Sequence, residues 1–207
     1  MIGANAGSGN WRGPSGANLT GALNISSSFT LEVASGTPAF NLTATGNSSV
    51  TGNLGLSGTT NTWTVNPGFT MTVSGNISGA SAAITKNGTG TLTLSGNNTY
   101  SGTTTISAGT IEIGAAGRLG AGSYAQNITN NGTLIYSGTN AQTLSGIISG
   151  TGNLTQNASS TLTLSGNNTY SGATTINSGT LEIGAAGRLG GGNYAQNINN
   201  NGTLIYS

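Results

Sequence analysis

The chain has 207 residues, 37 of them glycine, and only 3% of its residues are charged, with a formal net charge of +1. Four Lys and Arg residues in all cannot form the basic patch that binding to a phosphate backbone requires, which argues against a nucleic-acid partner. The sequence contains no Cys and no His, so it excludes disulfides, thiolate metal sites and the common catalytic triads, and we expect no cofactor and no metal.

The first segment, residues 1–17, is rich in glycine and carries one charge, Arg12. It has no apolar run typical of a signal peptide, and no stretch of the chain reaches the roughly 18 apolar residues of a membrane-spanning helix. We therefore expect a flexible lead-in or cap over 1–17, a single domain over 18–207, and no insertion of this segment into a membrane.

Short strands recur through the rest of the chain. In TLTL (91–94) and TIEI (110–113) apolar and polar residues alternate, which is the pattern of a half-buried strand with Leu92 and Leu94 pointing inward. Gly or Asn interrupts every such segment within about eight residues, and no window has the period of a helix. The fold class is therefore all-β.

A long repeat is visible without alignment to any other protein. Residues 91–137 and 161–207 align without a gap and establish a 70-residue duplication. The seven differences are mild: Thr103/Ala173, Ser107/Asn177, Ala108/Ser178, Ile111/Leu181, Ala121/Gly191, Ser123/Asn193 and Thr129/Asn199. Aliphatic residues that precede polar corners suggest a finer period, with steps of 22, 22, 26, 22 and 22 between Ile84, Ile106, Ile128, Leu154, Ile176 and Ile198. We interpret each long repeat as three short ones, with two weaker copies upstream whose strands start at Phe29 and Phe69.

Two architectures could use these strands. One is an antiparallel meander with hairpins at Asn87-Gly88 and Asn131-Gly132. The other is a parallel β-solenoid of about 22 residues per turn and about eight or nine turns, in which equivalent positions stack one turn apart. Only the solenoid explains repeats of equal length that contain near-identical sequence motifs. It predicts that Leu92, Ile111 and Leu134 form one inward column.

The word SGNNTYSG occurs at 95–102 and again at 165–172. Gly and Asn are suited to a tight turn, so we interpret the word as a structural corner built around Asn97, Asn98, Tyr100, Asn167, Asn168 and Tyr170. The tyrosines are expected either to lie flat over the surface or to wedge into the corner. The alternative is a ligand-binding corner made of Tyr and Asn.

Segments 88–114 and 159–184 resemble the autotransporter-associated β-strand repeat, also called the passenger-associated transport repeat. The shared pattern is G-T-L-x-L-x-G-x-N-T-Y-x-G-x-T-x-I-x-x-G-T-L. The resemblance implies a right-handed parallel β-helix in a secreted or cell-surface passenger of a Gram-negative bacterium, acting as an adhesin, a spacer or a carrier of other domains. No signal peptide and no C-terminal membrane barrel accompany the repeats, so we expect a passenger segment of a longer protein.

Catalysis is not expected. The carboxylates are Glu32, Glu112 and Glu182, and the last two would lie three turns apart in one column, about 14 Å by strand spacing, which is too far for glycoside hydrolysis. Glu112 recurs with Arg118 as Glu182 with Arg188. These four residues are either solvated charges in weak ion pairs or a recognition stripe.

Three further roles stay open. One outward column of threonines (Thr91, Thr110, Thr133, Thr161, Thr180 and Thr203) suggests ice binding, but the column two residues on contains Glu112, Ile135, Glu182 and Ile205. A polysaccharide or a host surface is a possible partner. The uncharged last strand, TLIYS (203–207), could also pair with a second copy of the chain, which would build a filament head to tail.

Overall fold

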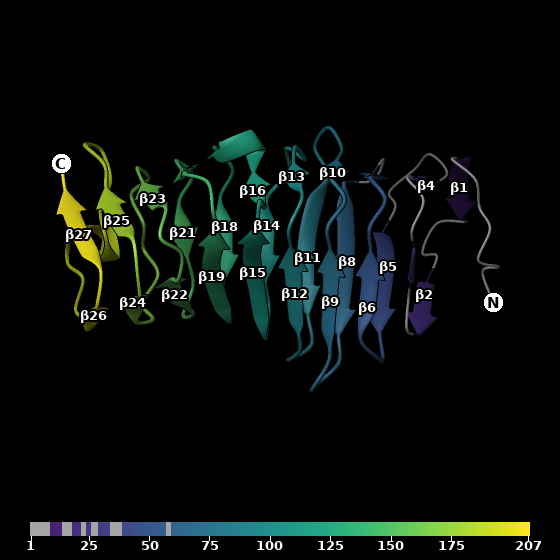
Figure 1. Ribbon diagram of the computed structural model, residues 1–207, viewed down its shortest axis with the longest axis horizontal. Coiled ribbons are helices and arrows are strands. Elements are labelled where there is room, and N and C mark those ends of the chain that lie inside the picture. The colour runs from purple at the N-terminus through teal and green to yellow at the C-terminus, as the bar shows by residue number, and fades with distance from the viewer. Residues whose placement is uncertain (1–8, 14–17, 22–23, 26–28, 34–38, 57–58) are drawn as a thin grey trace.

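The computed structural model describes residues 9–13, 18–21, 24–25, 29–33, 39–56 and 59–207. Every strand pairing among these residues is parallel, and the turns stack along one axis with β1 and β27 at opposite ends (Figure 1). The predicted parallel β-solenoid is confirmed. No antiparallel hairpin forms at Asn87-Gly88 or Asn131-Gly132, because the strands on either side of each turn pair with strands one turn away.

Each turn crosses three faces, and each face is a stack of parallel strands. The first face is one sheet: β2 (Asn18–Gly21), β5 (Ala39–Ala44), β8 (Thr60–Val65), β11 (Ala83–Asn87), β14 (Thr104–Ile106), β18 (Ile128–Asn130) and β21 (Ile148–Ser149). The second face is also one sheet: β3 (Asn24–Ile25), β6 (Ser48–Val50), β9 (Thr70–Val73), β12 (Thr91–Leu94), β15 (Thr110–Ala115), β19 (Thr133–Gly138), β22 (Asn153–Gln156), β24 (Thr174–Ile176) and β26 (Ile198–Asn200).

The third face is built from three successive sheets. They are β1 (Gly9–Gly13), β4 (Phe29–Val33), β7 (Leu54–Leu56) and β10 (Ile77–Ser78); then β13 (Asn97–Asn98) and β16 (Arg118–Leu119); then β17 (Ser123–Tyr124), β20 (Gln142–Leu144), β23 (Thr161–Leu164), β25 (Thr180–Ile183) and β27 (Thr203–Tyr206). Two 3-10 turns, η1 (Gly120–Gly122) and η2 (Gly190–Gly192), follow the GAAGRL segments.

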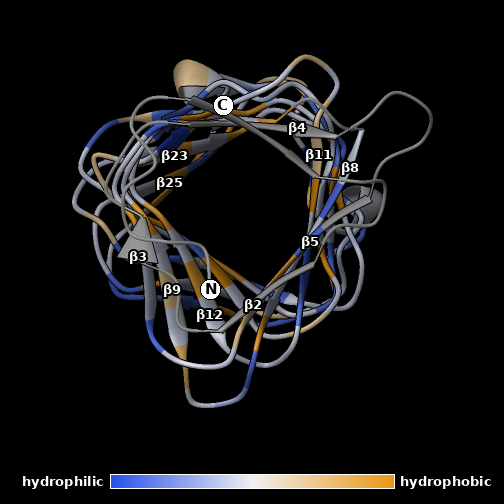
Figure 2. Ribbon diagram, turned by 90° about the vertical axis from the view of Figure 1, so that its right-hand side faces the viewer, coloured by the Kyte–Doolittle hydropathy of each residue, from blue (hydrophilic) through white to orange (hydrophobic). Residues whose placement is uncertain are grey.

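The inward side chains form one continuous core along the axis. Leu92 pairs with Ile111 and Ile111 pairs with Leu134, and all three are at most 2% exposed, so the predicted column is confirmed. In the strands between the two ends of the solenoid alternate residues are buried, as in β12, where the two leucines are inside and the two threonines are half-buried. Viewed along the axis, the strands of the three faces surround this apolar interior (Figure 2).

Turn length is less uniform than the predicted 22 residues. The step between paired residues is 19 from Leu92 to Ile111, 20 from Leu134 to Leu154, and 25 from Phe29 to Leu54. The interpretation of Phe29 and Phe69 as equivalent strand starts in two upstream copies is therefore wrong. Phe29 starts β4 on the third face, whereas Phe69 precedes β9 on the second.

The long repeat does not contain three whole turns. The predicted step from Ile128 to Leu154 is not one turn: Ile128 pairs with Ile148 on the first face, and Leu154 pairs with Leu134 on the second. Consequently TLTL of the first copy is β12 on the second face, whereas TLTL of the second copy is β23 on the third face. Seventy residues make three turns plus one face, so the second copy is displaced one face around the axis.

The predicted boundary after residue 17 stays a prediction. Residues 1–8 and 14–17 lie outside the described part of the chain. Within the expected lead-in, Gly9–Gly13 forms β1 and pairs in parallel with β4, so this part of the segment already belongs to the third face.

Candidate functional site

The SGNNTYSG word joins successive turns through a buried asparagine. In the first copy it crosses the third face, where the side chain of Asn98 is fully buried. Its Oδ1 accepts a hydrogen bond from the Ile77 N–H of the preceding turn at 3.0 Å. Its Nδ2 donates to the Gly96 carbonyl of its own turn at 2.8 Å and to the Arg118 carbonyl of the next turn at 3.1 Å. One side chain therefore ties three consecutive turns together.

The second copy builds the same corner on another face. Asn168 Oδ1 accepts from the Ile148 N–H at 2.9 Å, and its Nδ2 donates to the Gly166 carbonyl at 2.8 Å. Ile148 belongs to the sheet of the first face, so the word now crosses that face. Asn97 and Asn167, the other predicted corner residues, have exposed side chains.

Both corner tyrosines point into the solenoid. Tyr100 and Tyr170 are at most 1% exposed, so of the two predicted placements the wedged one is found. The Tyr100 hydroxyl shares a hydrogen bond with Thr104 Oγ1 at 2.8 Å, which also bonds the Tyr124 hydroxyl at 2.8 Å. Tyr124 then donates to the Gly102 carbonyl at 2.5 Å. The Tyr100 and Tyr124 rings meet edge to face, with centroids 5.7 Å apart.

The same chain of hydroxyls recurs in the second copy through Tyr170, Thr174, Tyr194 and the Gly172 carbonyl. Burial raises the pKa of Tyr100 and of Tyr170 well above the ordinary value, and it raises the pKa of Tyr124 to about 12. Tyr100, Tyr124 and Tyr170 therefore stay neutral at physiological pH. Their hydroxyls take part in hydrogen bonds that join neighbouring turns, and none of them is available as a base.

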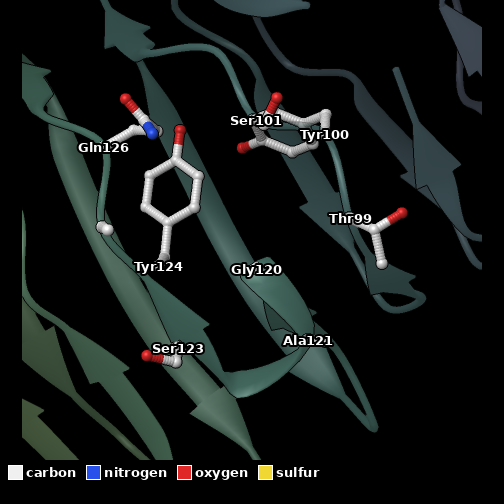
Figure 3. Close-up of a pocket in the computed structure, with 9 residues that line it drawn as sticks. Thr99, Tyr100, Ser101, Gly120, Ala121, Ser123, Tyr124 and Gln126 are labelled. Carbon is white, nitrogen blue, oxygen red and sulfur yellow. The ribbon is translucent and has the colours of Figure 1, made fainter. Parts of the chain in front are cut away.

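A shallow pocket of about 280 Å³ opens beside the first corner (Figure 3). The segment Thr99–Ser101 forms one wall, and the η1 turn with the stretch from Ser123 to Gln126 forms the other. No ionisable side chain lines it apart from Tyr100 and Tyr124, whose hydroxyls bond to Thr104. Thus the corner holds the turns together on its inner side and presents an uncharged recess on its outer side.

The turn beside the pocket explains one difference between the copies. Ala121 adopts a φ of 54°, in the left-handed region that costs a non-glycine residue about 1 kcal/mol or more, and its equivalent Gly191 has a φ of 64°. We expect Ala121→Gly to raise the free energy of unfolding by about 0.5 kcal/mol, because relief of strain is partly offset by the greater freedom of glycine in the unfolded chain. Urea unfolding of this variant and of Gly191→Ala checks this; a loss for the first, or a gain for the second, would contradict it.

Another repeated position clamps the corner that follows β11. Lys86 is fully buried, and its Nζ donates to the carbonyls of Asn87 at 2.8 Å, Gly88 at 2.7 Å and Ala108 at 3.4 Å. Seventy residues later, Gln156 donates through Nε2 to the carbonyls of Ala158, Ser160 and Thr180 at 2.7–3.3 Å. An ammonium and an amide therefore fill the same place, and the ammonium has no carboxylate beside it among the described residues.

The buried ammonium predicts a pH dependence. Burial lowers the pKa of Lys86 from 10.5 to about 8. Between pH 8 and 10 the unfolded chain therefore binds more protons than the folded one, and stability should rise with pH by about 2 kcal/mol. From about pH 9 the buried tyrosines oppose this rise, because they ionise first in the unfolded chain, so the contribution of Lys86 is read as the difference between the parent chain and a variant without it. Lys86→Gln, which copies Gln156, should abolish the rise. Urea midpoints from pH 7 to 10 measure it, and a slope equal to that of the parent chain would refute this origin.

The four charged residues do not form one stripe. Glu112 lies in β15 on the second face and Glu182 in β25 on the third, so the predicted column with a 14 Å separation is wrong. Within the described residues neither carboxylate forms an ion pair, and the interpretation of the four residues as solvated surface charges stays a prediction. Glu182 instead accepts from the hydroxyls of Thr163 and Ser207, each at 3.2 Å. A role of these residues in recognition stays a prediction.

The predicted threonine column is likewise divided. Thr91, Thr110 and Thr133 stack on the second face, where the next turn places Asn153 in their column. Thr161, Thr180 and Thr203 stack on the third face. No single face carries the six-threonine column, which removes the regularity that suggested ice binding.

Several residues of this site were not identified from the sequence. At the 70-residue offset Thr104 recurs as Thr174, Tyr124 recurs as Tyr194, and Lys86 is replaced by Gln156. Only the buried hydrogen bonds show what these residues do. Within the described residues no cluster of three or more acidic, Cys or His side chains could hold a metal ion. In that same part of the chain, no helix has the length and apolar character needed to cross a membrane.

Comparison with known proteins agrees with this geometry. The model of the passenger-associated transport repeat matches residues 84–113 and 154–183. The chain contains two passenger-associated transport repeats. Each match begins in the strand that contains Lys86 or Gln156, continues through the SGNNTYSG motif, and ends with the TIEI or TLEI strand. The transport repeat is therefore a segment of about one and two-thirds turns, placed on different faces in its two copies.

One curated relative shares much of this chain. The chain is 42% identical over 219 aligned residues, covering 80% of this chain, to the adhesin BmaC autotransporter of Brucella suis biovar 1 (strain 1330). This chain spans only 6% of the length of that relative. No solved structure matches significantly.

Proposed function

We propose that this chain is a structural segment of a secreted or surface-exposed bacterial adhesin, serving as part of a stiff shaft. The observation that carries the proposal is that two passenger-associated transport repeats lie within one uninterrupted parallel β-solenoid. A solenoid whose turns are tied by buried side chains keeps its length and direction, which suits a spacer. The autotransporter adhesin relative supports a place at the cell surface.

Surface exposure can be tested in cells that make the protein. Antibodies raised against the purified chain should label intact cells, and protease added outside should remove the label. A cytosolic protein probed in the same way is the control. Label that appears only after lysis would contradict the proposal.

We also propose that the role is not enzymatic. Glu112 and Glu182 lie on different faces, so the two carboxylates do not face one substrate. The double variant Glu112→Gln, Glu182→Gln should keep the fold and surface display. Hydrolysis of a polysaccharide by the parent chain that this variant loses would overturn the proposal. End-to-end association stays a prediction, which sedimentation across a concentration series tests.

A further inference from the structure

The pocket beside the first corner has polar side chains on its rim that are available to a ligand. The side chains of Thr99, Ser123 and Gln126 line it and make no hydrogen bond within the described residues. Thr99 and Ser123 are exposed and Gln126 is half-buried. Figure 3 labels Gln126, Tyr124 and Tyr100 among the residues that line this recess. Two hydroxyls and one primary amide thus offer donors and acceptors to a ligand.

The lining excludes some classes of ligand. It carries no charge at neutral pH, because burial keeps Tyr100 and Tyr124 protonated, so it offers no counter-charge to an ion. A peptide adding as a strand needs unpaired backbone groups. Here the Thr99 N–H already donates to the Ile77 carbonyl at 2.7 Å and the Ser101 N–H to the Gly79 carbonyl at 3.1 Å.

The remaining chemistry fits a sugar ring. Apolar surface comes from Gly120, Ala121 and Ala125, against which the C–H face of a pyranose can lie, while the rim groups reach its hydroxyls. The volume of about 280 Å³ is near the lower end of ligand pockets, which run roughly from 300 to 1,000 Å³, and suits one small ring.

We propose that this pocket binds one ring of a neutral, hydroxyl-rich glycan, such as a hexose unit of a surface polysaccharide. The lining recurs at Thr169–Ser171 and Gly190–Gln196, with Gly191 for Ala121 and Asn193 for Ser123. Because the second copy lies one face around, the shaft would present such recesses in more than one direction. This proposal goes beyond the role as a shaft and can be tested without cells.

The test is a titration of the isotope-labelled chain, followed by backbone amide signals. The probes are maltotetraose, mannotetraose and galactotetraose, with a heparin tetrasaccharide as the charged comparison. At least one neutral probe should shift the amides of Thr99, Ser123 and Gln126 at millimolar concentration. Gln126→Leu should weaken that binding about tenfold, since it removes hydrogen bonds to the ring. The control Thr105→Val, in β14 on the first face, should bind as the parent chain does.

Three results would overturn the proposal: no shift with any neutral probe, shifts confined to residues outside this pocket and its counterpart at 169–171 and 190–196, or equal binding at this pocket by the Gln126→Leu variant. A response to heparin alone would also overturn it. The amide spectrum of each variant without sugar shows whether its fold is unchanged. If Gln126→Leu perturbs the fold, Ser123→Ala replaces it with the same expected direction.

Discussion

Replacing Asn98 by Ala is expected to lower the free energy of unfolding by about 3 kcal/mol, because buried backbone groups lose their only side-chain partner. The Ile77 N–H would face no acceptor, and the Arg118 carbonyl would lose a donor from the neighbouring turn. Each unsatisfied buried group costs roughly 1–3 kcal/mol. The large effect follows from one amide that bonds to three turns.

The neighbouring residue is a matched control. Asn97 has the same side chain, but it is exposed and makes no side-chain hydrogen bond within the described residues. Asn97→Ala should therefore change stability by less than about 0.5 kcal/mol. Urea unfolding of the two variants at pH 7 compares them directly. Equal losses would show that the hydrogen bonds of the buried Asn98 side chain are not what stabilises the corner.

Gly172→Ala is expected to cost about 3 kcal/mol, because the added methyl group has no space. A Cβ at this position would overlap the carbonyl group of Gly152, one turn away. That atom is backbone, held in the stacked turns, so it cannot rotate aside as a side chain could. The glycine of the SGNNTYSG motif is thus required by the close approach of two turns of the backbone, since its own φ lies outside the left-handed region.

Gly184→Ala provides the comparison within the same copy. The nearest atoms to a Cβ there are the side chains of Ser165 and Thr163 at 3.5 Å, an ordinary contact distance. This variant should unfold within about 0.5 kcal/mol of the parent chain. Thermal and urea unfolding of both variants measure the difference. A tolerated Gly172→Ala would mean that the turns are less tightly stacked than the structure indicates.

The fold class was accessible from the sequence because strand alternation and exact repetition both depend on local rules. Leu92 and Leu94 alternate with threonines, and repetition at a fixed offset demands an architecture in which equivalent residues stack. The inward column of Leu92, Ile111 and Leu134 follows from these two observations alone.

The position of the second copy was not accessible in this way. A period read from corner residues assumes that every corner joins the same two faces, but Ile128 precedes the second face and Leu154 precedes the third. Turn length varies from 19 to 25 residues, so residue counting cannot separate three turns from three and one-third. Only hydrogen-bond register distinguishes them.

The sequence predicted the corner itself more fully than the residues of other turns that bond to it. Asn and Gly in SGNNTYSG indicate a turn, but the two asparagines are adjacent and identical, and only strand phase buries Asn98 and exposes Asn97. Tyr124 lies more than 20 residues from Tyr100 and carries no turn signal, so its hydrogen bond to Thr104 depends on how the turns stack.

Disulfide trapping tests the displacement of the second copy most directly, since the chain has no native Cys. Thr133 and Asn153 are paired outward residues on adjacent turns of the second face, at a strand spacing of about 4.8 Å that permits a disulfide. Mild oxidation should cross-link the double variant Thr133→Cys, Asn153→Cys and leave Thr133→Cys, Thr161→Cys reduced. A disulfide between positions 133 and 161, with none between 133 and 153, would place both copies in one column and contradict a repeat of three turns plus one face.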